Sequence, residues 1–286
     1  MDNKLGGEEM KYNDEIKNVS IDARAINIGT NVVFGKNVFI KVLGEFQIGD
    51  YSKIGDNSII MGNNIKMGKW FYNSDQLRIG GGGRFGPEAN FLCGDRAVIL
   101  NSFINVCKPV TIGDDFNMSE ESTILTHGYS LSVLDGYPAS FEAVKIGNSV
   151  EIGYRSLVLM GVEIVSKCVI GAQSIVTKSL TQSGIYVGSP AKYIKPLVPL
   201  NYEQRIEILN HILNEYQKIA LFHGVTSNIK FNYPYITMKE FTLNVENYKY
   251  EGKEDEDTDD LRDYLRKWGI RIYTTRPFKS KISIKI

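Results

Sequence analysis

The sequence has few of the residues that build disulfide frameworks, charged docking surfaces or membrane spans. Only three cysteines occur in 286 residues (Cys93, Cys107 and Cys168), and no two form a CxxC pair. An odd number of isolated cysteines fits small buried hydrophobes in a reducing compartment. Lys and Arg total 33, as do Asp and Glu, so no basic excess points to nucleic acid. Neither a run of 18 apolar residues nor an apolar signal segment is present, which predicts a cytoplasmic protein without a membrane span.

A step of six residues organises the segment 144–178. Neither a helix, with its period of 3.6, nor an ordinary strand, with its period of 2, produces such a step. It is typical of a parallel β-helix built from hexapeptide rungs, in which three sides make a coil of about 18 residues. The aliphatic residues that follow this step are Ile146, Ile152, Val158, Ile164, Ile170 and Val176.

The same step recurs upstream and sets the predicted domain limits. Apolar residues six apart, with small register shifts between groups, occur at Ile28, Phe34 and Ile40, at Ile48, Ile54 and Ile60, at Ile79 and Phe85, at Val98, Ile104 and Val110, and at Ile112, Met118 and Ile124. We therefore expect a lead-in over 1–25, a β-helix over 26–196 and a C-terminal extension over 197–286. The step is interrupted at 128–143, which predicts a loop extruded from the β-helix.

Two further segments need an interpretation. The glycine run IGGGGRFGPE (79–88) lacks the GK[ST] of a phosphate-binding loop, so we interpret it as turn geometry within a coil. Within the extension, Ile206, Leu209, Leu213, Tyr216 and Ala220 are spaced as in an amphipathic helix. Four runs are typical of strands, namely 229–238, 241–250, 270–275 and 281–286. Residues 257–269 are typical of a short helix, after an acidic stretch interpreted as a solvated turn. The extension is thus predicted to be a small α+β appendage.

The segments VIGAQSIVTK (169–178) and GSPAKYIK (188–195) are similar to the closing coils of the hexapeptide-repeat acyltransferases, and the resemblance spans roughly residues 26–196. It is closest to enzymes that acetylate sugars and capsular polysaccharides. This resemblance implies a mainly β fold, namely a left-handed parallel β-helix with a C-terminal helix and appendage. It also implies a homotrimer with active sites between subunits and acetyl-CoA, without a metal, lying along the prism.

The resemblance also implies the catalytic residues. His127 ends the rung STILTH just before the extruded loop and matches the family's catalytic histidine. A neutral imidazole there can take the proton of an attacking hydroxyl. Asn101 resembles the family's acceptor-facing asparagine, with Asn105 as the alternative. Glu121 is our candidate to orient the His127 ring, although no spacing rule separates it from Glu120 and an acid of a neighbouring subunit is an equal alternative; Asp114 and Asp115 fit a plain turn.

Coenzyme A carries phosphates and needs cations and backbone donors. Carried over from the family, the expected cofactor-binding residues are Gly153, Gly171, Ala172, Ser174, Thr177, Lys178, Lys192 and Lys195. Three positions depart from the family's pattern: Glu151, Val165 and Gln173. These departures affect the expected cofactor contacts more than the expected fold.

The preferred function is acetyl-CoA-dependent O-acetylation of a sugar or surface-glycan hydroxyl. The alternatives are N-acetylation of a nucleotide-linked amino sugar, acetylation of a streptogramin-type antibiotic, and a catalytically silent binding prism. A zinc hydratase on the same prism needs three imidazoles at each metal, whereas only His127 lies within the repeats. The other two histidines, His211 and His223, belong to the helix of the extension and are interpreted as structural or solvent-facing.

Overall fold

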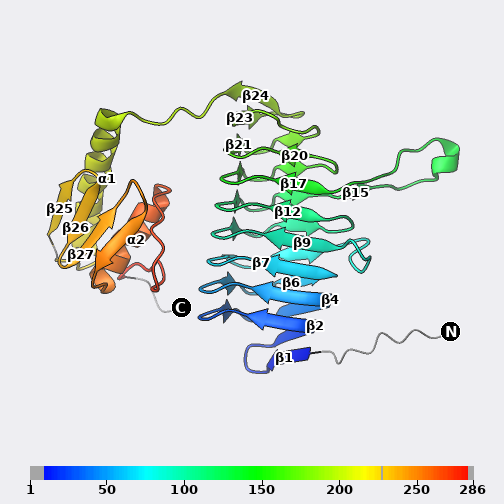
Figure 1. Ribbon diagram of the computed structural model, residues 1–286, viewed down its shortest axis with the longest axis horizontal. Helices are drawn as coiled ribbons and strands as arrows, with labels where there is room; N and C mark the ends of the chain where they lie inside the picture. Colours follow the sequence, from blue (N-terminus) through cyan, green and yellow to red (C-terminus); the bar gives the residue numbers. More distant parts are fainter. Residues whose placement is uncertain (1–9, 227, 283–286) are drawn as a thin grey trace. The chain divides into compact units, whose positions relative to one another are not determined.

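The computed structural model describes residues 10–226 and 228–282. The chain divides into two units, with the boundary between Leu197 and Val198. In the first unit the chain winds through stacked coils, and each short strand pairs in parallel with the strand one coil further on (Figure 1). This β-solenoid confirms the predicted parallel β-helix, and the second unit carries the predicted helix and small sheet.

Three flat faces run along the solenoid. The first contains the second halves of β2 (Val19–Ile28) and β4 (Val38–Ile48), followed by β7 (Asn64–Met67), β9 (Asn90–Cys93), β12 (Val110–Ile112), β17 (Val144–Ile146) and β20 (Glu163–Ile164). The second contains β3 (Val33–Phe34), β5 (Lys53–Ile54), β10 (Val98–Ile99), β13 (Asn117–Met118), β18 (Glu151–Ile152), β21 (Cys168–Ile170), β23 (Gly184–Val187) and β24 (Lys192–Lys195). The third contains the first halves of β2 and β4, followed by β6 (Ile59–Gly62), β8 (Arg78–Gly80), β11 (Phe103–Asn105), β14 (Thr123–Ile124), β19 (Leu157–Val158) and β22 (Ile175–Val176).

The core is the stack of inward aliphatic side chains. All six residues of the step at 144–178 are buried, and Ile152 pairs with Ile170 as Val158 does with Val176. Burial of this continuous apolar column removes the hydrophobic surface of each coil from water. The register predicted from the sequence is therefore correct over the closing coils.

Three expectations about the solenoid were wrong. Residues 10–25 are not a loose lead-in: β1 (Met10–Asp14) pairs antiparallel with β2, and Val19, Ile21 and Ala23 of β2 are buried in the core. Phe85 is exposed, because the chain leaves the coil after Gly80. Around position 98 the inward residue is Ile99, one residue later than the predicted Val98.

The three corners between the faces are built differently. At two of them a residue in the left-handed region turns the chain. The first corner has one in each coil, namely Asn31, Tyr51, Trp70, Arg96, Asp115, Ser149 and Lys167. The second has one in each coil except that of β10 and β11, namely Asn37, Asn57, Gln76, Glu121, Arg155 and Gln173. Such regular turns leave no room for insertions. The third corner, where the third face passes into the first, has no such non-glycine series among the described residues.

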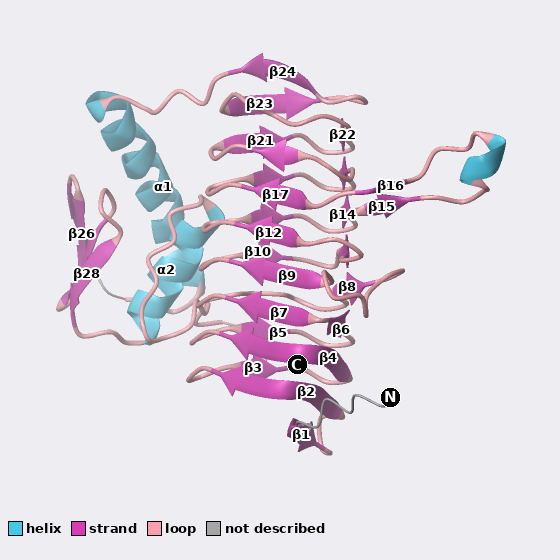
Figure 2. Cartoon of the chain, turned by 45° about the vertical axis from the view of Figure 1, so that its right-hand side comes forward, coloured by secondary structure: helices cyan, strands magenta, loops and turns pink. Residues whose placement is uncertain are grey.

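Both long excursions leave the solenoid at this third corner (Figure 2). Residues 81–88 follow β8, and the segment 128–143, predicted as an extruded loop, follows β14 as a hairpin. Its strands β15 (His127–Gly128) and β16 (Ser140–Phe141) pair antiparallel, and a 3-10 turn, η1, spans Val133–Asp135. The coil containing β11 lies between the coils that carry the two excursions.

The second unit has its own core. Helix α1 (Tyr202–Phe222) begins at Asn201, whose side chain forms a capping box with Gln204, and it buries Leu209, Leu213 and Tyr216 as predicted. A four-stranded antiparallel sheet follows, with strands β25 (Ile229–Asn232), β26 (Tyr235–Met238), β27 (Phe241–Asn244) and β28 (Lys249–Gly252). Helix α2 (Glu256–Lys267) completes the unit. The predicted strand at 270–275 does not form, and the one at 281–286 lies mostly outside the described residues.

The acidic stretch before and within α2 is not a solvated turn. Asp257, Asp259 and Asp260 are buried, because basic and polar groups from distant parts of the unit surround them. Arg276 pairs with Asp259, and His223 contacts Asp260 through Nδ1 at 2.7 Å. His223 is therefore structural, as predicted. No helix in the described ranges is long and apolar enough to cross a membrane.

Candidate active site

His127 stands where the solenoid ends and the hairpin begins. It follows the buried residues Ile124 and Thr126, and as the first residue of β15 it pairs with Phe141. The inward packing of β14 and the antiparallel pairing of β15 thus hold its backbone on both sides. The side chain is half-buried at the third corner.

Asn105, one coil earlier, holds the imidazole ring. Its Oδ1 lies 2.7 Å from His127 Nδ1 and also accepts hydrogen bonds from Thr126 Oγ1 at 2.5 Å and from the backbone N–H of Cys107 at 3.1 Å. Its Nδ2 donates to the carbonyl oxygens of Gly80 and Gly82, at 3.0 and 3.1 Å. Asn105 is 1% exposed, so every polar atom of its side chain is buried and satisfied.

This network decides which nitrogen of His127 carries a proton. The amide of Asn105 has only one orientation, because two carbonyl oxygens require its NH₂ group and the Cys107 N–H requires its oxygen. Oδ1 only accepts, so His127 Nδ1 must donate. The neutral ring then presents an unprotonated Nε2, which is the form of a general base.

The glycine run lies directly against this nitrogen. A Cβ atom at Gly82 would stand 3.1 Å from His127 Nε2, and one at Gly83 would stand 2.4 Å from Cys107 Sγ. Side chains at these two positions would therefore fill the space beside the base or displace Cys107. The run is more than a turn within a coil: it forms one wall of the site.

Aromatic rings form another wall. The ring of Phe141 stacks on His127 with 6.1 Å between centroids and 12° between planes, and Tyr129 lies 5.3 Å from His127. Tyr129 and Phe141 also stack on each other at 5.4 Å, and both are exposed. The root of the hairpin therefore offers an apolar surface beside the base.

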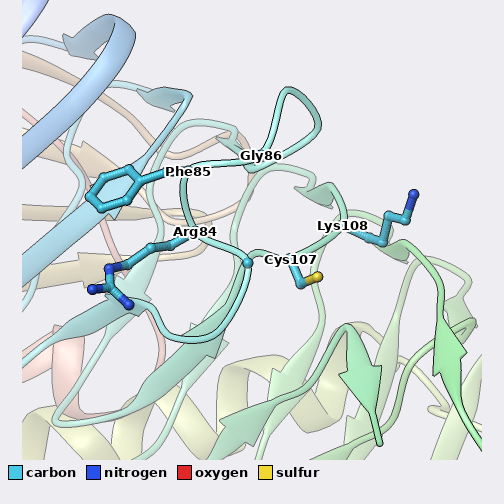
Figure 3. Close-up of a pocket in the computed structure, with 6 residues that line it drawn as sticks. Arg84, Phe85, Gly86, Cys107 and Lys108 are labelled. Atoms are coloured by element: carbon cyan, nitrogen blue, oxygen red, sulfur yellow. The ribbon is translucent and has the colours of Figure 1, made fainter.

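A cavity of about 450 Å³ adjoins the glycine run. Figure 3 shows Arg84 and Phe85 on one side of it and Cys107 and Lys108 on the other. Lys108 pairs with Glu88, whereas Arg84 donates to the Gly81 carbonyl at 3.1 Å and lies over the Phe85 ring. This pocket is broadly open to solvent.

Thr177 and Lys178 lie at the same corner as His127. They directly follow β22, which is two strands from β14 in the sheet. They therefore lie about 10 Å from His127 along the solenoid axis. Both are exposed. The structure thus aligns these two predicted cofactor residues with the base on one edge.

Asn101 and Glu121 lie at a different corner of the solenoid from His127. Both lie at the corner between the second and third faces, where Glu121 N–H donates to the Asn101 carbonyl. The Glu121 carboxylate accepts from Arg155 Nε at 2.5 Å and Tyr154 Oη at 3.2 Å, and the bond from Arg155 lowers its pKa. Glu121 therefore does not orient the His127 ring within this chain, and Asn101 lies away from it. Asn105, the alternative to Asn101, holds the ring, because β11 ends at the third corner.

The remaining predicted cofactor residues are spread over other parts of the solenoid. Gly153, Gly171 and Ala172 lie at the corner of Glu121, while Lys192 and Lys195 are exposed on β24. The backbone N–H and carbonyl of Gly171 both bond within the solenoid, to Tyr186 and Ser156.

Ser174 is also corrected as a cofactor contact. It is fully buried, its Oγ accepts from Gly188 N–H, and its own N–H and carbonyl bond to Ser156 and Leu157. It belongs to a column of buried serines that tie one coil to the next. Its backbone N–H and carbonyl thus bond within the solenoid, and its side chain is out of reach of a ligand on the surface.

Two components of the site were missed or ranked second from sequence. Asn105 was the alternative to Asn101, and the glycine run was assigned to turn geometry only. The available signal was that the run and the extruded loop interrupt the six-residue step at the same side of the coil, two coils apart. Excursions from one corner of a solenoid converge in space.

Comparisons with known proteins find several acetyltransferases among the similar chains. Chloramphenicol acetyltransferase from Morganella morganii is 30% identical over 145 residues, which cover 46% of this chain and 67% of that protein. The enzyme of the same name from Klebsiella aerogenes is 31% identical over 151 residues, with the same coverage. The chain thus spans about two thirds of the curated relatives. No family model matches the sequence.

Among solved structures, a hexapeptide-repeat acetyltransferase from Vibrio cholerae complexed with acetyl coenzyme A has a TM-score of 0.37 and 23% identity, covering 43% of this chain and 65% of that one. An N-acyltransferase from Bacillus cereus in complex with dTDP and coenzyme A has a TM-score of 0.43 and 18% identity, covering 66% and 91%. A maltose O-acetyltransferase from Clostridium difficile has a TM-score of 0.30 and 20% identity, covering 62% and 69%.

Proposed function

The chain belongs to the hexapeptide-repeat acyltransferases, which take the acyl group from coenzyme A, and on this premise we propose that it O-acetylates a sugar hydroxyl with His127 as the general base. The observation that carries the proposal is the 2.7 Å contact between His127 Nδ1 and Asn105 Oδ1, which leaves Nε2 unprotonated. A hydroxyl is a poor nucleophile at neutral pH and needs such a base, whereas a neutral amine needs it less. This favours O-transfer over N-transfer.

The reaction then follows from the roles of the side chains. His127 Nε2 removes the hydroxyl proton as the acceptor oxygen attacks the thioester carbonyl carbon. When the carbon–sulfur bond breaks, the imidazolium returns that proton to the departing thiolate, so protons and charge balance. Asn105 Oδ1 continues to accept from Nδ1 and stabilises the transient positive ring. The rings of Tyr129 and Phe141 offer the acceptor an apolar surface beside the base.

The third corner is where we place the donor. Acetyl-CoA supplies a thioester at one end and phosphates at the other, so the base and a cation should lie along one track. Thr177 and Lys178 are exposed two strands beyond β14 on this edge. In this proposal their side chains hold the nucleotide end, with Lys192 and Lys195 as further cations.

Acceptor identity is the finer part of the proposal. The exposed rings of Tyr129 and Phe141 suit the apolar face of a pyranose, which supports a sugar or surface glycan. A second candidate acceptor is chloramphenicol, because the two curated relatives carry the name of that activity. Both candidates belong in the same acceptor panel.

The decisive experiment measures release of the coenzyme A thiol with acetyl-CoA and a panel of sugars, glycans, amino sugars and chloramphenicol. We expect release with at least one hydroxyl acceptor, an O-acetyl ester on the product, and loss of about 10²–10⁴-fold in kcat for His127→Ala. His211→Ala, in the second unit, is the matched control and should keep the parental rate. A panel without any thiol release, or an N-acetyl product, contradicts the proposal.

Lys178 provides a separate test of the position proposed for acetyl-CoA along the third corner. Lys178→Ala should raise the KM for acetyl-CoA by about 10- to 100-fold, the cost of one charge-assisted hydrogen bond, without lowering kcat equally. Lys145→Ala removes an exposed lysine paired with Glu163 on the first face and serves as the control. Equal KM values for the two variants would place the nucleotide elsewhere.

For the assembly and the cell, we propose a cytoplasmic homotrimer with active sites between subunits, acting in capsule or surface-polysaccharide synthesis. Three cysteines without a disulfide among the described residues fit a reducing compartment. The exposed apolar side chains of the hairpin, including Leu131, Val133 and Leu134, support contact with another surface. Light scattering of the purified protein tests the trimer, and a monomer at micromolar concentration would contradict it.

A further inference from the structure

We propose that Thr126 is a positioning residue, whose hydroxyl group sets how strongly Asn105 Oδ1 holds the His127 ring in each of the two charge states of that ring. The inference rests on the proposed function, since it adds a residue that tunes the proposed base. It starts from a mismatch at one atom. Asn105 Oδ1 faces three hydrogen-bond donors, whereas an amide oxygen has two lone pairs.

The three donors to this oxygen differ in what else they can bond to. His127 Nδ1 lies 2.7 Å from Asn105 Oδ1 and the Cys107 nitrogen lies 3.1 Å from it, and within the described residues neither has a second acceptor. Thr126 Oγ1 lies 2.5 Å from the same oxygen and also 3.3 Å from the backbone carbonyl oxygen of Asn105. The hydroxyl is therefore the one donor of the three that can turn to another acceptor.

The surroundings of Thr126 hold its oxygen in place and leave its proton free to turn. The side chain is 0% exposed, so bulk water does not reach the hydroxyl. The backbone N–H of Lys108 donates to Thr126 Oγ1 at 3.1 Å, and the N–H of Glu142 donates to the Thr126 carbonyl at 3.0 Å. Rotation about the Cβ–Oγ1 bond remains, and it carries the proton from one oxygen of Asn105 to the other.

Each charge state of the ring favours one of these two positions. A neutral imidazole forms an ordinary hydrogen bond through its Nδ1–H, so Asn105 Oδ1 can share its lone pairs with the hydroxyl. An imidazolium forms a charge-assisted hydrogen bond, which is stronger the less its acceptor is shared. The hydroxyl therefore donates to Oδ1 while His127 is neutral and to the Asn105 carbonyl once the ring is charged. Its proton stays on Thr126 in both states.

This exchange keeps the base neutral until the reaction charges it. Turning from an acceptor at 2.5 Å to one at 3.3 Å costs free energy, and that cost opposes protonation of the resting ring. The form with an unprotonated Nε2 is thereby favoured at neutral pH. When the proton of the acceptor hydroxyl arrives at Nε2, the Thr126 hydroxyl turns aside and Asn105 Oδ1 stabilises the positive ring.

Other titratable groups surround the ring without replacing this contact. In the described part of the chain, Asn105 Oδ1 is the only polar atom that hydrogen-bonds to His127. The titratable side chains on the neighbouring segments are Arg84 and Glu88 of the glycine run, Cys107 and Lys108 after β11, and Tyr129 and Glu142 at the hairpin. A substitution at Thr126 changes none of these groups, so a difference between variants reports the hydroxyl.

The experiment weakens the hydroxyl in graded steps. Thr126→Ser keeps it, Thr126→Cys offers a thiol that donates weakly, and Thr126→Val removes the donor while keeping the shape of the side chain. In the full-length protein, histidine labelled with ¹³C at Cε1 gives one NMR signal for each of the three histidines, and His127→Ala and His211→Ala assign them. The readout is the titration midpoint of His127 between pH 5 and 9, with thermal unfolding measured separately for each variant.

We expect the His127 midpoint to rise by about 0.5 to 1 pH unit in Thr126→Val, to rise by a smaller step in Thr126→Cys, and to stay at the parental value in Thr126→Ser. The acid limb of kcat/KM should move with the midpoint, while the signals of His211 and His223 keep theirs.

Thr126→Val leaves the Lys108 N–H without its acceptor and should lower the Tm; if it does not fold, Thr126→Cys decides alone. Parental midpoints in the folded variants, with a lower Tm only, make Thr126 structural and overturn the proposal. An equal rise in Thr126→Ser assigns the effect to packing and also overturns it. Shifted midpoints in a protein that transfers no acyl group overturn the proposed function and leave the role of Thr126 intact.

Discussion

At the scale of single residues, the geometry of His127 depends on an amide one coil away. Asn105 binds five groups from three segments of the chain, and the oxygen that faces His127 Nδ1 is fixed by the Cys107 N–H on the same atom. A buried network of this kind has one arrangement only. The tautomer of the base is therefore a property of the fold.

Asn105→Ala is expected to lower kcat by about 10- to 100-fold, because the ring loses the acceptor that fixes its tautomer. Asn105→Asp should instead move the acid limb of the pH–rate profile to higher pH, since a carboxylate stabilises the imidazolium. The measurement is kcat/KM from pH 5 to 9. Asn73→Ala, at another fully buried asparagine with structural partners only, should lower the Tm and leave the profile unchanged. Identical profiles for the Asn105→Asp and parental enzymes would contradict this role.

The three cysteines should differ in reactivity. Burial raises the pKa of the Cys93 and Cys168 thiols, whereas Cys107 is partly exposed in the cavity. A raised pKa leaves little thiolate at pH 8, so iodoacetamide should label Cys107 alone in the native protein and all three after unfolding. Labelling should also lower activity, because Cys107 Sγ lies against Gly83.

Mass spectrometry of the labelled peptides checks the site, and Cys107→Ser should be active and insensitive to the reagent. Native labelling of Cys93 or Cys168 at a similar rate would show that the core opens more readily than its burial implies.

At the scale of elements, the two excursions follow from how the corners are made. Where a residue with positive φ turns the chain in every coil, an insertion would break the stack of turns. The third corner has no such series in the described coils, so it accommodates both the glycine run and the hairpin. The site therefore lies at the corner of the solenoid that lacks a regular left-handed turn in the described coils.

The hairpin should contribute to acceptor binding and not to stability. Replacing residues 130–138 by Gly-Ser-Gly keeps β15 and β16, and η1 buries none of its residues. We expect the Tm to change by less than about 3 °C and the KM for the acceptor to rise by about 10-fold or more, with KM for acetyl-CoA unchanged. Calorimetry and steady-state kinetics check both. A fall of more than about 5 °C would mean that the hairpin packs on part of the fold.

Sequence patterns predict some elements of this fold better than others. The six-residue step identifies the inward residues from Ile146 to Val176 because a coil buries them whatever its neighbours do. It does not predict that Phe85 is exposed or that Asn105, four residues from Asn101, occupies a different corner. These depend on where each coil turns, and a shift of a few residues there moves a side chain to another edge of the prism.

At the scale of the whole molecule, the chain consists of two units with separate cores. The second shows the limit of sequence patterns most clearly. Asp257, Asp259 and Asp260 looked solvated because an acidic run has no apolar partner nearby in sequence. Their partners, which include Arg276 and Lys281, come from the far end of the unit.

The connection between the units should be the first site of proteolysis. Residues 196–200 belong to no helix or strand, and Leu197, Val198 and Leu200 are exposed. Thermolysin cuts before large apolar residues, so we expect early cleavage there and two resistant fragments, because backbone inside the packed units is protected by hydrogen bonds. Replacing the three residues by Asp should slow the cleavage. A first cut inside the solenoid would contradict this expectation.

The parallel stacking of the third face has a consequence for distances. Strands in a sheet repeat every 4.7–4.9 Å, and β14, β19 and β22 are successive neighbours. The number of coils between His127 and Thr177 therefore sets the distance from the base to the neighbouring cation Lys178 in steps of one strand spacing. Inserting or deleting one coil would change the length of substrate arm that fits by about 5 Å and leave each end chemically unchanged.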